Sequence, residues 1–341
     1  MSILQGSSTR IGAAGGFALL VLAAGVSAAP AAGSKAHTAP PAVEPVARTA
    51  EPGSPPVRHD RIRLATGVEL HVAQAGPADG VPVVLLHGFT DSWFSWSMVI
   101  ERLPADIRVI VPTQRGHGDS GRPGCCYAIG DFARDVVALL DALDIRRAHV
   151  IGHSMGGLVA QRVAIDSPER VNRLVIVGSA ASVRNEAVIE FNEVVQQLSD
   201  PIDPAFIRDF QLATTALPLP PEFLERVVQE SAKLPARMWR EVLGGLLAPE
   251  ALHDVSRITA PTLIVWGAQD AFFPRSQQEE LVRAIDGARL LVYPDAAHSP
   301  TWEIPGRFVD DVMAFLGIGG KALDLPGRQP TRRAGGAAPG M

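Results

Sequence analysis

Runs of apolar residues alternate with segments of helical spacing along most of this chain. Mostly apolar runs, typical of strands covered on both faces, lie at 81–86, 107–111, 148–151, 173–177, 261–266 and 289–293. Apolar residues that recur three and four positions apart predict helices at 93–103, 129–143, 158–165, 275–285 and 305–316. Strands that alternate with helices predict an α/β fold, with a mostly parallel sheet covered by helices on both faces.

One stretch before the first apolar run has a different period. Residues 61–64 and 68–73 alternate polar and apolar positions around Thr66 and Gly67. This period of two predicts a half-buried hairpin at an edge of the sheet.

A long insertion interrupts the alternation of strands and helices. Residues 182–256 contain no convincing strand, but helical segments are predicted at 188–198, 204–212, 221–234 and 237–247. An insertion at the carboxyl edge of a parallel sheet lies over the crevice where ligands bind. We therefore interpret 182–256 as a helical cap on a core formed by 57–181 and 257–316.

The two ends of the chain differ from this core. Residues 1–28 combine Arg10, an apolar run and a small-x-small site, which is the pattern of a secretory signal peptide. The apolar run is too short for a comfortable membrane span, so we expect a secreted or periplasmic protein with no stable membrane insertion, anchored only if the segment is uncleaved. Residues 29–56 are rich in Ala and Pro and predict a disordered linker, and 317–341 predict a flexible tail.

Composition narrows the class of protein. The 341 residues, 47% of them hydrophobic and 20% charged, are enough for a large globular core. A formal net charge of −5 gives no basic surface for nucleic acid, so we expect no nucleic-acid partner. The sequence contains no internal repeat and no indication of oligomeric state.

Cys125 and Cys126 are the only cysteines, and they are neighbours in the sequence. Neighbouring cysteines can bridge only through a strained eight-membered ring, so we expect two ordinary loop thiols and no stabilising disulfide framework. Two adjacent sulfurs also make a poor zinc site, and the sequence has no His-Glu-x-x-His motif. We therefore predict no metal site.

Residues 152–156 read Gly-His-Ser-Met-Gly and lie between a predicted strand and a predicted helix. They match the Gly-x-Ser-x-Gly nucleophile elbow, in which a serine lies on a strained turn and the glycines allow close approach of the backbones. Ser154 would then point its hydroxyl out of the turn. The start of the following helix would place N–H groups beside any oxyanion that forms there.

A serine hydroxyl needs a neighbouring base, and the imidazole of His298 suits that role because it follows the last predicted strand at the same sheet edge. Asp270 follows the preceding strand by a short turn and would hold the imidazole in the correct tautomer. No acid follows the strand that ends at Val177. Asp295 shares the loop of His298 and is expected to be a turn residue. The predicted catalytic residues are therefore Ser154, Asp270 and His298.

Together these motifs resemble the serine-dependent α/β-hydrolase superfamily over roughly 61–316. The resemblance rests on 152–156, His87-Gly88, the Arg-Gly-His-Gly-Asp-Ser run at 115–120, the Gly-Ala-Gln-Asp run at 267–270, and His298. The chain order of nucleophile, acid and histidine is also that of the superfamily. Thr113 departs from it, because relatives commonly carry an acid two residues before the arginine.

The resemblance implies that the main-chain N–H groups of Phe89 and Met155 form the oxyanion hole, and that no metal or organic cofactor is needed. Beside this loop, His87, Trp93, Phe94 and His153 are candidate pocket residues. Core packing is the alternative for the aromatic residues, and hydrogen bonding to nearby main chain is the alternative for the histidines.

The predicted function is a serine hydrolase that cleaves a small-molecule carboxylic ester, or a lactone, through an acyl-enzyme. The same residues also serve relatives that cleave amides or carbon–carbon bonds, and cofactor-free perhydrolases of the haloperoxidase type. Ser154 argues against relatives with an aspartate nucleophile, such as epoxide hydrolases. A member that binds a small molecule without turnover is a further alternative.

Overall fold

The computed structural model of the protein describes residues 56–248 and 254–320. The predicted signal peptide, all of the predicted linker except Pro56, and the tail beyond residue 320 lie outside the described residues. Secretion therefore stays a prediction. Among the described helices, none combines the length and the apolar character needed to cross a bilayer.

A single eight-stranded sheet forms the centre of the fold, with the strand order β1-β2-β4-β3-β5-β6-β7-β8. Strands β3 to β8 are parallel, and the β1–β2 hairpin joins them antiparallel through β4. This confirms the predicted edge hairpin and the mostly parallel sheet. The strands are β1 (Arg58–Arg63), β2 (Glu69–Ala75), β3 (Val81–Leu86), β4 (Ile107–Pro112), β5 (Ala148–His153), β6 (Val171–Val177), β7 (Thr262–Gly267) and β8 (Arg289–Tyr293).

Helices cover both faces of the sheet because successive residues of each buried strand point to opposite faces. In β3, Val84 and Leu86 contribute to one apolar core, and Val83 and Leu85 contribute to the other. The first core is covered by α3 (Ile129–Ala142), α4 (Met155–Asp166) and α9 (Arg275–Ala284). The second is covered by α2 (Ser97–Ile100) and α11 (Pro305–Leu316).

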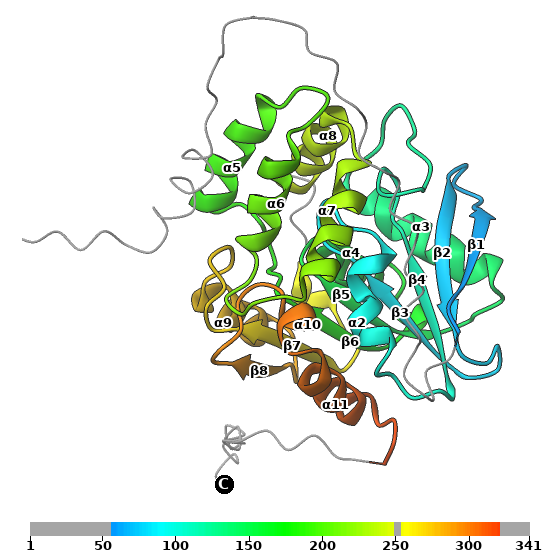
Figure 1. The fold of residues 1–341 in the computed structure, drawn as a ribbon. Coiled ribbons are helices and arrows are strands. Elements are labelled where there is room, and N and C mark those ends of the chain that lie inside the picture. Colours follow the sequence, from blue (N-terminus) through cyan, green and yellow to red (C-terminus); the bar gives the residue numbers. More distant parts are fainter. Residues whose placement is uncertain (1–55, 249–253, 321–341) are drawn as a thin grey trace, which may run out of the picture.

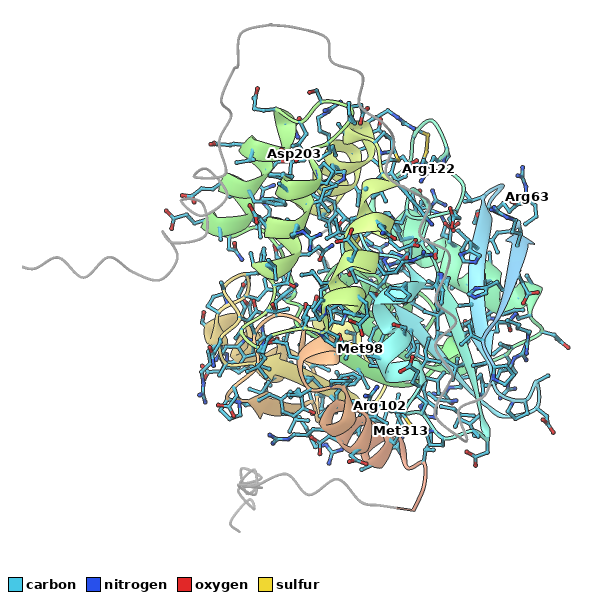
Figure 2. All side chains as sticks on the ribbon, viewed as in Figure 1. Arg63, Met98, Arg102, Arg122, Asp203 and Met313 are labelled. Carbon is cyan, nitrogen blue, oxygen red and sulfur yellow. A yellow bond between two sulfur atoms is a disulfide. The ribbon has the colours of Figure 1, made fainter. Side chains whose placement is uncertain are left out.

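The segment predicted as a cap contains four helices that lie together on one side of the sheet (Figure 1). They are α5 (Glu186–Gln196), α6 (Pro204–Leu212), α7 (Pro221–Ala232) and α8 (Ala236–Leu247). Asp203 caps α6 at the outer end of this group, where its side chain accepts a hydrogen bond from the Ala205 N–H (Figure 2). Helix α6 runs inward from there, so its last turn reaches the sheet edge.

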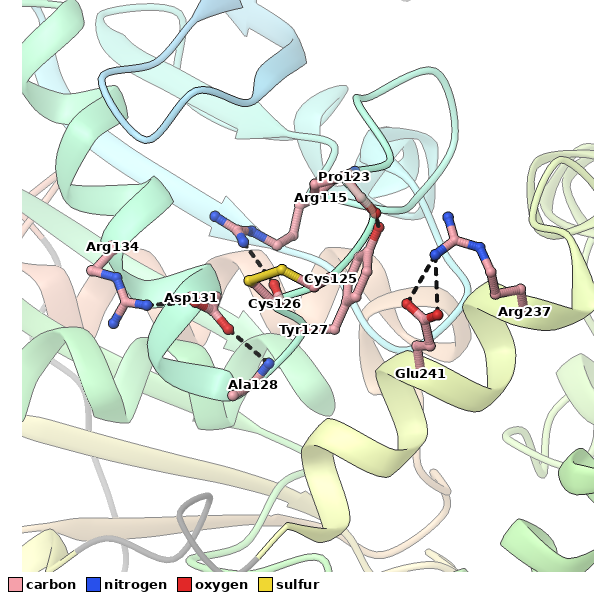
Figure 3. The surroundings of a disulfide bond; sticks show 10 residues. All are labelled: Arg115, Pro123, Cys125, Cys126, Tyr127, Ala128, Asp131, Arg134, Arg237 and Glu241. Atoms are coloured by element: carbon pink, nitrogen blue, oxygen red, sulfur yellow. Dashed lines mark hydrogen bonds and ion pairs between the residues drawn. A yellow bond between two sulfur atoms is a disulfide. The ribbon is translucent and has the colours of Figure 1, made fainter.

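Cys125 and Cys126 are bonded to each other, so the expectation of two free thiols was wrong (Figure 3). In extended backbone, neighbouring side chains point to opposite sides, but Cys126 has a positive φ of 75°, which turns the chain and lets the sulfurs meet. The bond joins neighbours only, so it links no distant segments. Arg115 holds the loop by donating a hydrogen bond to the Cys126 carbonyl, and it also forms a buried ion pair with Asp135 of α3.

Candidate active site

Ser154 lies at the turn between β5 and α4, in a backbone state that most residues avoid, with φ of 53° and ψ of −117°. The turn is possible because the neighbouring segments pass very close. A Cβ on Gly152 would come within 2.1 Å of the Gly156 carbonyl oxygen, and a Cβ on Gly156 within 2.2 Å of the Leu86 oxygen. The two glycines of the motif therefore have the steric role expected of a nucleophile elbow.

His298 and Asp270 meet at this sheet edge, although 28 residues separate them. The Nδ1 atom of His298 lies 3.0 Å from Oδ2 of Asp270, and both side chains are almost fully buried. The other oxygen of Asp270, Oδ1, accepts hydrogen bonds from the main-chain N–H groups of Phe272 and Phe273. These bonds fix the carboxylate so that Oδ2 faces the imidazole.

Glycine also makes room for the histidine loop. Gly178, directly after β6, has a φ of 49°, and a Cβ there would lie 2.4 Å from the carbonyl oxygen of His298. Farther along, Glu303 of the short helix α10 (Pro300–Glu303) accepts hydrogen bonds from Ala297 N–H and from two residues of the cap. The loop that carries His298 is thus held from both the sheet and the cap.

A cavity of about 60 Å³ lies between the sheet edge and the cap, and both Ser154 and His298 line it. Its polar lining includes Asp91, Gln211, Thr214 and Ser299. Its apolar lining consists of Phe89, Met155, Val183, Val188, Phe191, Phe210, Leu243, Leu246, Phe272, Phe273 and Trp302. Typical ligand pockets hold about 300 Å³ or more, so this cavity is small for a ligand site.

Comparison with known proteins agrees with this fold. Residues 81–305 match the family described as alpha/beta hydrolase fold. The chain belongs to the α/β-hydrolase family. This α/β-hydrolase is 30% identical over 266 residues to the dihydrolipoyllysine-residue acetyltransferase component of the acetoin cleaving system of Pseudomonas putida, in a match covering 71% of this chain and 65% of that protein.

Two further relatives are matched over nearly their whole length. The α/β-hydrolase is 29% identical over 273 residues to 3-oxoadipate enol-lactonase 2 of Acinetobacter baylyi. This match covers 76% of this chain and 98% of the relative. Among solved structures, it is similar to a thermophilic esterase from Thermogutta terrifontis, with a TM-score of 0.65 and 27% identity over 76% of this chain and 98% of that chain.

Phe89 and Met155 of this α/β-hydrolase both line the cavity next to Ser154. Met155 is the first residue of α4, so its N–H has no partner within the helix. Among the described residues, no main-chain carbonyl accepts a hydrogen bond from either amide. Neither amide is therefore committed to a main-chain hydrogen bond.

Of the histidines predicted in the pocket, His153 lines the cavity and His87 does not. The imidazole of His87 bridges two main-chain groups, because Nε2 accepts from the Gln114 N–H and Nδ1 then donates to the Gly88 carbonyl. Burial lowers the pKa of His87 well below its usual value. Burial also lowers the pKa of His153 to about 3, and its Nε2 donates to the His298 carbonyl, so His153 is neutral and supports the loop that carries His298.

Trp93 and Phe94, the aromatic candidates for the pocket, do not line this cavity, and they pack elsewhere, as the core-packing alternative allowed. Ser92 caps the short helix η1 (Trp93–Trp96) through a hydrogen bond from the Phe94 N–H. Trp93 then packs against the rings of His59 and His71, and Phe94 stacks on Phe223 of α7.

Two polar residues of the cavity were not predicted from the sequence. Asp91 is 3% exposed and follows the loop of His87, Gly88 and Phe89, and Gln211 is 1% exposed at the end of α6. Gln211 Nε2 lies 3.2 Å from Asp91 Oδ1 and also donates to Ser231 Oγ of α7. The position of Asp91 three residues after the His-Gly pair was the one local signal that the sequence offered.

Proposed function

We propose that this protein is a serine hydrolase that cleaves a carboxylic ester or lactone through an acyl-enzyme. The observation that carries the proposal is the contact of His298 Nδ1 with Asp270 Oδ2, made by a histidine that lines the same cavity as Ser154. The esterase and enol-lactonase relatives support the choice of bond.

In the first half of the proposed reaction, the Ser154 hydroxyl oxygen attacks the carbonyl carbon of the substrate, and His298 Nε2 takes the hydroxyl proton. Asp270 holds the opposite nitrogen, Nδ1, in its protonated form and stabilises the imidazolium. The N–H groups of Phe89 and Met155 stabilise the negative oxygen of the tetrahedral intermediate. The intermediate collapses when the carbon–oxygen bond to the alcohol breaks and His298 returns the proton to the leaving alcohol.

In the second half, a water molecule repeats these steps on the acyl-enzyme. His298 takes a proton from the water as its oxygen attacks the ester carbonyl, and it then returns that proton to Ser154 as the acid leaves. The cavity is mostly apolar, so the charges that develop near Ser154 are poorly screened by solvent, and the fixed donors act strongly.

Labelling with a fluorophosphonate distinguishes a serine hydrolase from a family member that binds a small molecule without hydrolysing it. We expect one equivalent of a small fluorophosphonate to label the protein, with the adduct on Ser154 by peptide mass spectrometry, and labelling to abolish hydrolysis of p-nitrophenyl esters. A protein that hydrolyses none of a graded series of esters and resists labelling would instead be a binding member of the family.

The cap residue Phe191 is expected to limit the size of the acyl or alcohol group. Its ring lines the cavity and stacks on Phe210 with centroids 5.0 Å apart, so Phe191→Ala should open space for a longer chain. We expect kcat/KM for long-chain esters relative to short ones to rise by about tenfold or more, since each methylene in an apolar pocket is worth about 1–3 kcal/mol. Steady-state kinetics over a series of acyl lengths measures this ratio.

Phe206→Ala is the matched control for this prediction. Phe206 also lies in the cap, but it packs against Trp239 and does not line the cavity. Its removal should leave the chain-length profile unchanged, and both variants should still label with a fluorophosphonate. An unchanged profile for a folded Phe191→Ala protein would show that the cap does not set selectivity through this residue.

A further inference from the structure

Asp91 is a buried carboxyl group in the catalytic cavity that the proposed reaction does not use. The side chains of Asp91 and Ser154 both lie next to Gly88. Asp91 Oδ2 is 3.0 Å from the position that a Cβ on Gly88 would take, and His153 Nδ1 and Ser154 Cβ are 3.2 and 3.4 Å from it. Glycine at this position leaves the carboxyl group open to whatever binds next to Ser154.

The surroundings of Asp91 do not neutralise its charge. Gln211 Nε2 donates to Oδ1, and the Gly88 main chain supplies a second hydrogen bond, but both donors are uncharged. A carboxylate has about four acceptor positions, so this leaves capacity for a ligand. Among the described residues that line the cavity, none is Arg or Lys. The cavity therefore offers a negative group and no fixed positive one.

The aromatic lining also favours a positively charged ligand over a negatively charged one. Phe89, Phe191 and Phe210 pack edge to face or stacked, and Phe272, Phe273 and Trp302 complete an apolar wall. Aromatic faces attract cations and give nothing to anions. A carboxylate brought into this cavity would lose its water and meet Asp91 with no Arg or Lys to compensate its charge, which is costly in a medium of low dielectric constant.

We propose that Asp91 is a specificity-determining residue that selects substrates by charge, so that the enzyme prefers an ester with an ammonium group near the scissile bond over an ester of the same shape with a carboxylate. This inference rests on the proposed ester hydrolysis and names its substrate class. Asp91 takes no part in bond breaking, and its effect is on which substrate reaches Ser154 productively.

The ionisation of Asp91 sets the pH range of this effect. Burial raises the pKa of the Asp91 carboxyl to about 7, so the group is largely neutral below that pH and charged above it. The other titratable groups that face it are His298, which lowers the pKa of Asp91, and His153, which is neutral because burial lowers its own pKa to about 3. Gln211 and Ser154 carry no charge. Discrimination against a carboxylate should therefore grow as pH rises through about 7.

Two series of isosteric esters test the proposal. In the acyl series, ethyl 3-(dimethylammonio)propanoate, ethyl 4-methylpentanoate and monoethyl succinate differ in charge while the acyl group keeps nearly the same shape. In the alcohol series, the charge likewise differs while the alcohol group keeps nearly the same shape. Its members are 2-(dimethylammonio)ethyl acetate, 3-methylbutyl acetate and 3-acetoxypropanoate. The measured quantity is the ratio of kcat/KM for the ammonium ester to that for the carboxylate ester, with the neutral ester as reference and the uncatalysed rate subtracted.

For the wild type near pH 7.5 we expect a ratio of about a hundred or more in at least one series, from the Coulomb interaction at a partly buried site. Asp91→Asn keeps the shape and the acceptor for Gln211 but removes the charge, and should reduce the ratio at least tenfold. Asp79→Asn, which changes an exposed carboxylate in the turn before β3, is the matched control and should leave the ratio unchanged.

The wild type alone provides a second measurement if Asp91→Asn does not fold. Between about pH 6 and pH 8, where succinate stays ionised, kcat/KM for the carboxylate ester relative to the neutral ester should fall several-fold in whichever series shows the charge preference. A ratio that does not vary with pH, or one that Asp91→Asn leaves intact, would overturn the charge selection while ester hydrolysis stands. A protein that turns over none of the six esters and does not label at Ser154 would overturn both proposals.

Discussion

Replacing Ser154 with alanine is expected to lower the kcat of ester hydrolysis by about four to six orders of magnitude and to leave the fold intact. The variant loses the attacking oxygen but keeps the Cβ, so the strained turn is unchanged. The Ser154 side chain makes no capping hydrogen bond to α4, so none is lost. Turnover of p-nitrophenyl esters and the midpoint of thermal unfolding measure the two parts of this expectation.

Ser179→Ala is the matched control for this variant. Ser179 is also buried and lies next to α4, where its Cβ is 2.6 Å from the position of a Cβ on Gly157, but it does not line the cavity. We expect its removal to change kcat by less than about threefold, because buried substitutions away from the site act on stability and not on chemistry. If Ser154→Ala retained more than a tenth of the wild-type kcat, Ser154 would not be the nucleophile.

The sheet was predictable from the sequence because its signals are local. The apolar run at β3 spans the six observed residues, and the prediction for β8 also has the observed ends. The strand order was not predictable in the same way. Strand β2 pairs with β4 and not with the next strand in sequence, β3, and this depends on which long-range contacts bury the most apolar surface.

The helices of the cap were predicted within about two residues, but their orientation was not. Phe191 and Phe206 are both apolar and lie in the first two helices of the cap, α5 and α6, yet only Phe191 lines the cavity. Which face of an amphipathic helix covers a ligand site depends on tertiary packing, which the helical period alone does not contain.

In the candidate active site too, residues with a local sequence signal could be predicted, and pairs that meet only through tertiary packing could not. Ser154, Asp270 and His298 could be proposed from the sequence because each follows a predicted strand within a few residues, so the topology brings them to one edge. Asp91 and Gln211 are 120 residues apart and became partners only through the docking of α6 on the core. The error for Cys125 and Cys126 had a local cause, because a positive φ at the second cysteine has no signature in the residue types.

The second large effect is expected for Asp270→Asn, which should lower kcat by about four orders of magnitude. In the wild type, Oδ1 accepts two main-chain N–H bonds, and Oδ2 faces Nδ1 of His298 at 3.0 Å. An asparagine would keep its oxygen at the two N–H groups and turn its NH₂ toward the imidazole. Nδ1 would then have to accept, so the ring proton would move to Nε2, which could no longer take the proton from Ser154.

Asp295→Asn is the control that makes this prediction specific to one carboxylate. Asp295 is three residues from His298 in sequence, but it is exposed, whereas the Asp270 side chain is fully buried against the imidazole. The control should keep kcat within about threefold of the wild type, since an exposed turn residue touches neither the imidazole nor the substrate. The assignment of the acid to Asp270 fails if Asp295→Asn proves to be the crippling change, or if a folded Asp270→Asn protein hydrolyses esters at more than a tenth of the wild-type rate.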